Sequence, residues 1–206
     1  MTSATAARTG ASASASDRVS TVRLDTERLS IVQLGPEAAG QVVAYYRGNA
    51  HHLAPWEPRR PEDFFTHDYW RASLARQLDD ATAGRALRLW LVARGDDHGP
   101  VLGNVGVTSI ERGPLLACRL GYSLAEARQG EGLMYEALQA VIAHVFGAMG
   151  LHRIEAGHLP ENTRSARLLR RLGFQPFGYS RDYLHIAGSW RDHVHNALTN
   201  PGPVAP

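Results

Sequence analysis

The chain has 206 residues with 22 basic and 20 acidic side chains, so its formal net charge is +2. This length fits one α/β domain, and so small a net charge does not by itself indicate a nucleic-acid binder. All basic residues are arginines, which excludes the Schiff-base and P-loop chemistry that needs lysine. Cys118 is the only cysteine, which excludes an intrachain disulfide, and its apolar surroundings favour a buried thiol. The ten histidines follow no recognised zinc spacing, so no metal is predicted.

The two ends of the chain differ in composition from the rest. Residues 1–21 are rich in Ala, Ser and Thr and lack the apolar core of a secretory signal, so we expect a disordered extension. Residues 22–199 are expected to form a single domain, and residues 200–206, rich in Pro and Gly, a tail. No apolar run approaches the roughly 18–20 residues of a membrane span, which favours a cytoplasmic protein without membrane contact.

Between these ends, hydrophobic periodicity predicts a series of strands and helices. Strands are expected at residues 26–34, 87–93, 101–110, 115–124, 153–158, 174–182 and 190–198. Helices are expected at residues 36–49, 63–83, 131–149 and 162–172, and the prolines up to Pro61 predict a loop at 51–58. The order β-α-α-β-β-β-α-β-α-β-β indicates a mixed α/β (α+β) fold, in which a mostly antiparallel sheet of about seven strands is flanked by about four helices.

A glycine loop joins the strand at 115–124 to the helix at 131–149. It reads Arg128-Gln129-Gly130-Glu131-Gly132, and its glycines let backbone N–H groups approach an anion in front of the helix. An isolated Gly-x-Gly pattern is more often a turn that only starts a helix. A Walker loop is excluded because it needs lysine, and a dinucleotide fingerprint because Tyr135 stands in place of its third glycine.

The helix expected at 162–172 has two different faces. At about 100° per residue, Ser165 shares one face with the leucines and points toward the sheet, whereas the arginines at 164, 167, 170 and 171 share the other. Asn162 is suited to cap the helix N-terminus. Ser165 could instead pack or bond a carbonyl of its own helix. A solvated surface is the more frequent role of such an arginine face.

Taken together, several motifs resemble the RimJ/RimL-type ribosomal-protein-alanine N-acetyltransferases of the GNAT superfamily. They are Leu-Ala-Pro-Trp-Glu-Pro at 53–58, Leu-Gly-Tyr-Ser at 120–123, the glycine loop, Asn-x-x-Ser at 162–165 and Trp-Arg-Asp-His at 190–193. The resemblance covers about residues 22–199 and implies a GNAT fold. It also implies direct transfer of acetyl from acetyl-CoA to the N-terminal α-amine, of alanine or serine, of a small-subunit ribosomal protein. No metal, nucleic acid or membrane is implied, and the enzyme would be a monomer or homodimer.

The resemblance also assigns roles to individual residues. The implied acetyl-CoA ligands are Ser123, Leu124, Arg128, Gln129, Gly130, Glu131, Gly132, Leu133, Asn162 and Ser165. Ser165 is the candidate acid for the departing thiolate and Asp182 a candidate base; Glu57 is a second candidate base, or grips the acceptor amine together with Trp56. Tyr122 is another candidate proton donor, although a core position is its simpler interpretation. Arg119 stands where many relatives place a glutamate base, and Ala127 where they place Arg or Gln.

Two other functions fit the same residues. The fold hosts many acceptors, so a small-molecule N-acetyltransferase acting on an antibiotic or amino acid is one alternative. The arginine face raises another, namely attraction of the 3′-phosphate of coenzyme A or of RNA. On that basis the chain could be a ribosome-assembly or regulatory factor with an incidental acetyl-CoA site.

Overall fold

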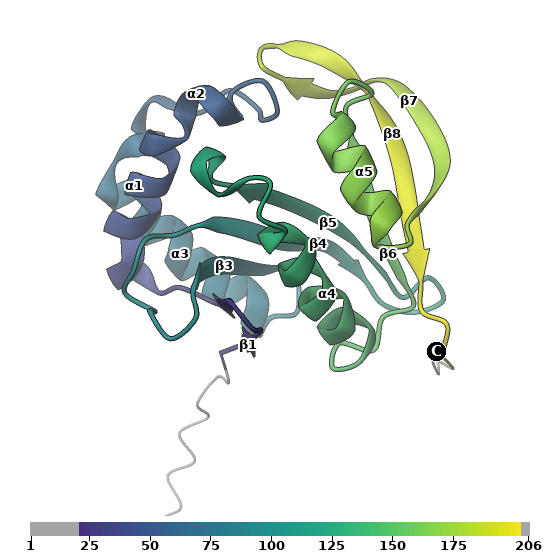
Figure 1. Cartoon of the computed structure of the whole chain (residues 1–206), viewed down its shortest axis with the longest axis horizontal. Helices are drawn as coiled ribbons and strands as arrows, with labels where there is room; N and C mark the ends of the chain where they lie inside the picture. The colour runs from purple at the N-terminus through teal and green to yellow at the C-terminus, as the bar shows by residue number, and fades with distance from the viewer. Residues whose placement is uncertain (1–20, 203–206) are drawn as a thin grey trace, which may run out of the picture.

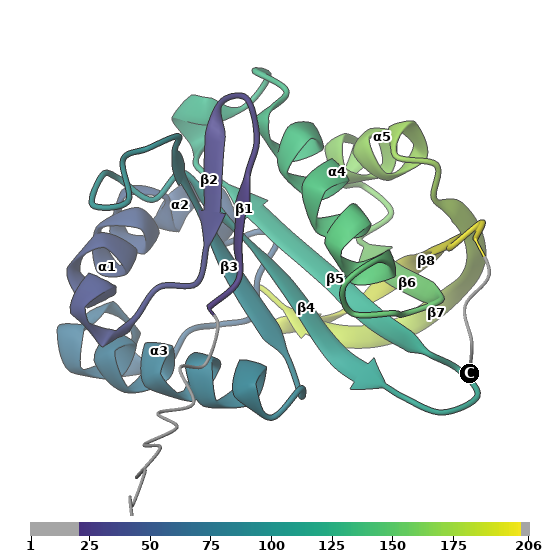
Figure 2. The same ribbon diagram turned by 90° about the horizontal axis from the view of Figure 1, so that it is seen from below.

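The computed structural model describes residues 21–202, and these form one mixed sheet with helices on both of its faces (Figures 1 and 2). The expected disordered extension lies, except for residue 21, outside the described residues, as does the end of the expected tail. Across the sheet the eight strands follow the order β1-β2-β3-β4-β5-β6-β8-β7. Every neighbouring pair is antiparallel except β5 and β6. No helix within residues 21–202 is long and apolar enough to span a membrane.

The eight strands differ in burial, since most of those inside the sheet are largely buried whereas the two at its edges are mostly exposed. In chain order they are β1 (Arg23–Asp25), β2 (Leu29–Val32), β3 (Leu87–Ala93), β4 (Gly103–Glu111), β5 (Ala117–Leu124), β6 (Arg153–His158), β7 (Gln175–Ile186) and β8 (Ser189–Thr199). The helices are α1 (Ala39–Gly48), α2 (Ala50–Leu53), α3 (His67–Thr82), α4 (Leu133–Phe146) and α5 (Thr163–Arg171). Single 3-10 turns are formed by Pro36–Ala38, Glu62–Phe65 and Glu126–Arg128.

Two apolar cores lie on opposite faces of the sheet. One buries residues of α4 and α5 against β2 to β6, and the other buries α1 and α3 against β2 and β3. Figure 2 shows these helix layers on either side of the strands. Cys118 belongs to the first core and is 2% exposed, which confirms the expected buried thiol.

The fold class is confirmed, but the structure differs from the predictions in two places. The strand expected at residues 26–34 is present as the shorter β2, whereas β1 before it was not predicted; the two form a hairpin around a turn in which the Thr26 N–H donates to the Leu29 carbonyl at 2.9 Å. Residues 51–58 were expected to lack helix, whereas α2 completes one helical turn before Pro55. The sheet therefore has eight strands rather than about seven, and the described residues contain five α-helices.

The sheet opens between its two parallel strands. Backbone pairing of β5 with β6 runs from Ala117 and Arg153 to Arg119 and Glu155, although β5 continues to Leu124. The second half of β5 therefore diverges from β6, and the glycine loop follows directly. Because side chains alternate along a strand, Tyr122 and Ser123 leave this free end of β5 toward opposite faces of the sheet.

Candidate functional site

The glycine loop has the backbone that its sequence requires. Gly130 and Gly132 adopt φ angles of 81° and 78°, in the left-handed region that favours glycine. Gly132 is the N-cap of α4, so the helix begins at Leu133 rather than at residue 131. The first backbone N–H groups of such a helix lack intrahelical acceptors and carry the positive end of its dipole. The loop thus presents donors suited to an anion.

Two further observations test whether an anionic group such as a pyrophosphate fits this loop. The Nε atom of Arg128 is buried without a hydrogen-bond partner among the described residues, while Nη2 of the same side chain pairs with Glu131 at 3.1 Å. A Cβ atom placed on Gly130 would meet nothing within 4 Å, so the backbone there faces open space. The loop therefore contains an unsatisfied donor, Arg128 Nε, and a glycine that faces open space. Both features fit a pyrophosphate bound in front of the loop.

Some of the expected cofactor ligands can contribute only backbone groups. The Leu133 side chain is buried in the core, and that of Leu124 packs against it. The Ser123 hydroxyl lies 2.9 Å from the Tyr45 hydroxyl of α1 and accepts a hydrogen bond from Asn104 at 2.7 Å. Ser123 is therefore engaged on the face of the sheet that α1 covers.

The opposite face of β5 brings together two of the expected catalytic residues. The Tyr122 hydroxyl lies 2.8 Å from Ser165 Oγ, and either oxygen can donate. Asn162 caps α5 as expected: its Oδ1 accepts from the Ser165 backbone N–H at 3.0 Å. Burial raises the pKa of Tyr122 to about 12, partly offset by its contact with Ser165. Tyr122 is therefore a neutral phenol at physiological pH and can donate a proton.

The Trp-Glu-Pro loop lies on the α1 side of the sheet. Glu57 forms an ion pair with Arg60, and its backbone carbonyl accepts from the Ala187 N–H at the tip of the β7–β8 hairpin at 3.0 Å. Burial raises the pKa of Tyr46 to about 12, and the negative charge of Glu57 adds to this shift. Trp56 is 37% exposed. A cavity of about 300 Å³ is lined by Glu57, Tyr46, Arg59, Arg60, Phe64 and Ala187, among others.

Asp182, the other expected base, lies in a different setting. It is exposed on β7, at a register shift between Ser180 and Leu184, and its φ of 46° is in the left-handed region. Its backbone N–H donates to Asp192 at 2.9 Å. Within residues 21–202 no hydrogen bond joins Asp182 to Tyr122 or Ser165, so the structure brings only the latter two together.

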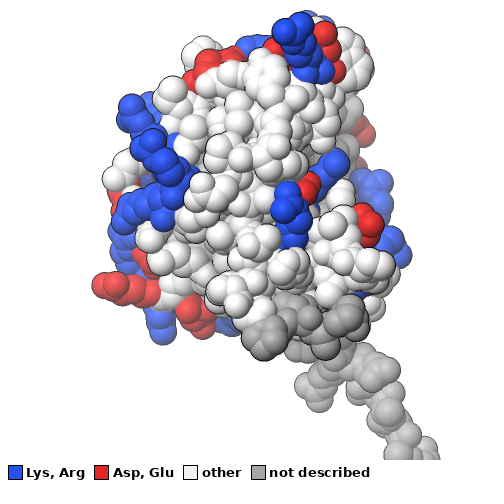
Figure 3. Space-filling model, turned by 90° about the vertical axis from the view of Figure 1, so that its right-hand side faces the viewer, with Lys and Arg blue, Asp and Glu red and all other residues white. Residues whose placement is uncertain are grey.

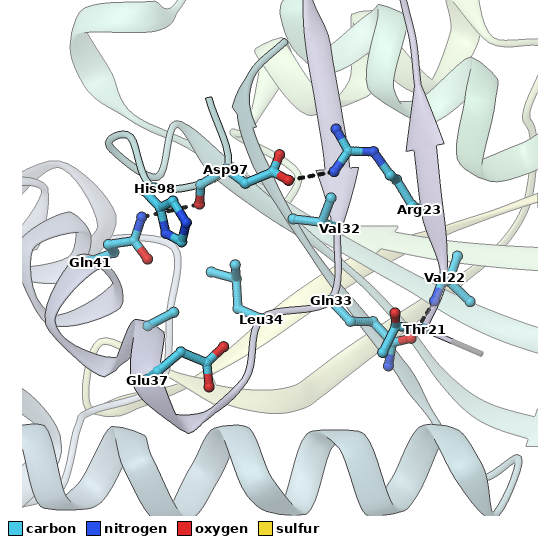
Figure 4. Close-up of a pocket in the computed structure, with 11 residues that line it drawn as sticks. Thr21, Val22, Arg23, Val32, Gln33, Leu34, Glu37, Gln41, Asp97 and His98 are labelled. Carbon is cyan, nitrogen blue, oxygen red and sulfur yellow. Dashed lines mark hydrogen bonds and ion pairs between the residues drawn. The ribbon is translucent and has the colours of Figure 1, made fainter. Parts of the chain in front are cut away.

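Several further observations concern residues around the site and elsewhere in the described structure. Arg119, where relatives place a base, is exposed and forms the last backbone pair with Glu155. Another cavity, of about 270 Å³, lies between β1, β2 and α1 and shares no residue with the glycine loop or α5 (Figure 4). Residues 21–202 hold no group of three side chains suited to a metal ion. Gln129 contacts both His52 and Arg164, which no local pattern predicts because these residues come from three separate segments.

Comparison with known proteins agrees with this geometry. The profile of the acetyltransferase (GNAT) domain matches residues 28–175. The [Ribosomal protein uS5]-alanine N-acetyltransferase of Escherichia coli is 41% identical over 87% of this chain and 92% of its own. The structure of the ribosomal-protein-S5-alanine acetyltransferase from Vibrio fischeri has a TM-score of 0.82 and 34% identity, covering 87% of this chain and 97% of that one. Mycobacterium smegmatis RimJ in complex with CoA-disulfide has a TM-score of 0.78 and 29% identity, covering 87% and 86%. The chain therefore belongs to the GNAT family of acetyl-CoA-dependent N-acetyltransferases.

Proposed function

We propose that this enzyme acetylates the N-terminal α-amine of a protein that begins with alanine or serine, and that its acceptor is a small-subunit ribosomal protein. The observation that carries the chemistry is the 2.8 Å contact of Tyr122 with Ser165, at the end of β5 from which the glycine loop departs. The acceptor is supported by the E. coli relative, which is named for the alanine of ribosomal protein uS5.

Acetyl-CoA supplies an activated acetyl thioester when bound. The backbone N–H groups from Gly130 to Leu133 and the unsatisfied Nε of Arg128 are the groups that would hold its pyrophosphate. The loop follows the end of β5 that no longer pairs with β6, and Tyr122 on that end of β5 contacts Ser165 at 2.8 Å. No metal is needed for this arrangement, because backbone dipoles and hydroxyl groups provide the donors.

Transfer requires one bond to form, one to break and one proton to move from nitrogen to sulfur. The amine nitrogen bonds to the acetyl carbon while the carbon–sulfur bond breaks. A terminal amine has a reference pKa of about 7.7–8.0, so only modest base assistance is needed near pH 7. Glu57 is the base that we favour, because it lines a cavity together with the buried Tyr46 and with Arg59 and Arg60. Since Arg60 is paired with Glu57, it is the charge of Arg59 that disfavours an ammonium ion there and so favours the reactive neutral amine.

On the other face of β5, Ser165 would donate a proton to the departing sulfur. Tyr122 can replace that proton through their shared hydrogen bond, because its raised pKa keeps the phenol protonated. The two hydroxyl groups thus act as a short relay from the strand to the thioester. Asn162 fixes the start of α5 and with it the position of Ser165.

The surface of the enzyme favours a protein acceptor over a small molecule. The β7–β8 hairpin exposes four large apolar side chains, Phe177, Tyr179, Leu184 and Trp190. The side of the molecule that carries β7 and β8 shows a broad area without charged side chains (Figure 3). Exposed apolar surface of this kind is typical of protein contact sites.

Mass spectrometry with a mixed acceptor pool tests the proposal. The enzyme and acetyl-CoA would be incubated with Ala- and Ser-starting peptides, an N-blocked peptide with an internal lysine, and an aminoglycoside. We expect acetyl only on the free α-amines, and a peptide beginning with the sequence of uS5 should be preferred. Acetylation of the lysine or the aminoglycoside would contradict the proposal and favour a small-molecule or side-chain acetyltransferase.

A further inference from the structure

Three polar contacts join the α1–α2 segment to the end of β5 and the glycine loop. Tyr45 contacts Ser123 at 2.9 Å, the Asn49 Oδ1 accepts from the Glu126 backbone N–H at 2.8 Å, and His52 Nε2 lies 2.7 Å from Gln129 Nε2. Tyr45, Asn49 and His52 are four and three residues apart, which places them on one side of a helical backbone. Their partners Ser123, Glu126 and Gln129 follow one another at intervals of three residues.

The third contact continues across the loop to α5. Gln129 Oε1 accepts a hydrogen bond from Arg164 Nη1 at 2.6 Å, so both ends of this amide are engaged. Arg164 immediately precedes Ser165. A chain of three side chains therefore runs from α2, over the glycine loop, to the residue beside the candidate acid. Figure 1 shows the turn after β5 lying between α1 and α5.

The chemistry of His52, Gln129 and Arg164 fixes the direction of the hydrogen bonds between them. A guanidinium group can only donate, so the amide atom that faces Arg164 must be the oxygen of Gln129. The amide nitrogen therefore faces His52 and donates to it. His52 Nε2 must then carry a lone pair, which places the proton of the neutral ring on Nδ1. The contact requires a neutral imidazole in this one tautomer.

The glycine loop is held on its other side as well. Arg28 donates from Nη1 to the Glu131 carbonyl at 2.9 Å. Gly130 thus lies between Gln129 and Glu131, whose positions are fixed by side chains of other segments. Since two glycines with left-handed backbone would otherwise leave the loop free to move, these contacts define the direction of its N–H groups.

We propose that Tyr45, Asn49 and His52 are positioning residues, and that the chain His52–Gln129–Arg164 holds the glycine loop and the Ser165 end of α5 as one unit. The inference rests on the proposed function of the loop as the coenzyme A site. Gln129 then serves acetyl transfer by orienting its neighbours rather than by contacting phosphate. Loop and helix would be arranged before coenzyme A arrives, which lowers the entropy that binding must overcome.

Substitutions at His52 test the linkage of His52, Gln129 and Arg164, with coenzyme A alone as the probe. Its dissociation constant would be measured by calorimetry, beside the KM for acetyl-CoA and kcat. His52→Ala should weaken coenzyme A binding by about three- to tenfold, the effect of one lost hydrogen bond. His52→Gln can place an acceptor where Nε2 lies and should restore most of the affinity. His52→Asn reaches only the Nδ1 position and should behave like alanine. The exposed neighbour His51 provides the control, and His51→Ala should not change the affinity.

A double-mutant cycle tests whether the two hydrogen bonds of Gln129 act together. Because the two hydrogen bonds of Gln129 polarise each other, the loss in the double variant His52→Ala/Arg164→Ala should be smaller than the product of the two single losses. Arg76→Ala, which removes an exposed arginine of α3 instead, is the control for Arg164. Independent single effects would overturn the proposal. Wild-type affinity in all His52 variants would overturn it too, even if their unfolding midpoints fell, since that would leave a structural role only.

These outcomes separate this inference from the proposed function. If the wild-type protein binds coenzyme A but transfers no acetyl to an α-amine, the proposed acceptor is wrong. The positioning role of His52, Gln129 and Arg164 is then decided by the coenzyme A affinities of the variants alone. If the wild-type protein does not bind coenzyme A, both are overturned.

Discussion

The Tyr122 hydroxyl and Ser165 Oγ lie 2.8 Å apart, although one belongs to a strand and the other to a helix 43 residues later. Their contact is possible because β5 and β6 pair only over their first residues, so the end of β5 is free to face α5. A half-buried phenol and a hydroxyl at this opening form the proton-donating side of the site.

Ser165→Ala should lower kcat more than it raises the KM for acetyl-CoA. Its hydroxyl is the last group of the proposed relay, and general acid assistance contributes about 10²–10⁴-fold in rate. Because Tyr122 remains as a second donor, we expect a loss toward the lower end of that range. Steady-state kinetics with an Ala-starting peptide measure it, and Tyr122→Phe should give a smaller loss. An unchanged kcat in Ser165→Ala would exclude the serine as the acid.

Glu57→Gln should slow the reaction most at low pH. Since the terminal amine has a reference pKa near 8, the fraction of free amine rises with pH and the need for a base falls. The kcat/KM profiles of wild type and variant should therefore differ below about pH 7.5 and converge near pH 9. Asp182→Asn, which alters an exposed carboxylate on β7, is the comparison. Should Asp182→Asn instead flatten the acidic limb while Glu57→Gln matches wild type, the base is Asp182.

Tyr122 should remain un-ionised in the folded protein until well above pH 10. Burial raises its pKa to about 12, whereas an unfolded tyrosine ionises near 10. The stability that this neutral phenol contributes is thus complete below about pH 10 and is lost as the pH rises toward 12. Ultraviolet titration of phenolate should give equal absorbance changes for wild type and Tyr122→Phe up to about pH 11, with circular dichroism reporting that both stay folded. A phenolate step near pH 10 that only wild type shows would contradict the burial argument.

Much of the fold follows from local sequence signals. The strands at 87–93 and 153–158 begin and end where hydrophobic alternation predicts, and α5 buries Leu169 while its arginines remain exposed. These elements combine strong periodicity with clear terminators, such as Asn162 and Gly173. Their formation depends little on distant residues, so a pattern in the chain is sufficient.

The unpredicted strand β1 depends on contacts that no local pattern contains. The turn between β1 and β2 has neither glycine nor proline, and Thr26 Oγ1 donates to Glu136 of α4 at 2.6 Å, 110 residues away. The site shows the same limit. Tyr122 and Ser165 could each be selected from motifs, but their contact depends on where β5 leaves β6. His52 is one of ten histidines and belongs to no motif in the sequence, because its partner Gln129 lies on another segment.

Gly130→Ala should reduce coenzyme A affinity through the ligand site rather than through stability. A left-handed backbone costs an alanine roughly 1–2 kcal/mol, and Gly113, in the turn between β4 and β5, has the same φ of 81° with nothing within 4 Å of a placed Cβ. Gly113→Ala is therefore a control with equal backbone strain at the opposite end of β5. Both variants should lose similar free energy of unfolding in urea, whereas only Gly130→Ala should raise the dissociation constant of coenzyme A, by about tenfold or more, because its methyl group enters the space before the N–H donors. Equal affinities in the two variants would show that the ligand does not approach the loop at Gly130, and the anion site would then have to lie elsewhere along α4.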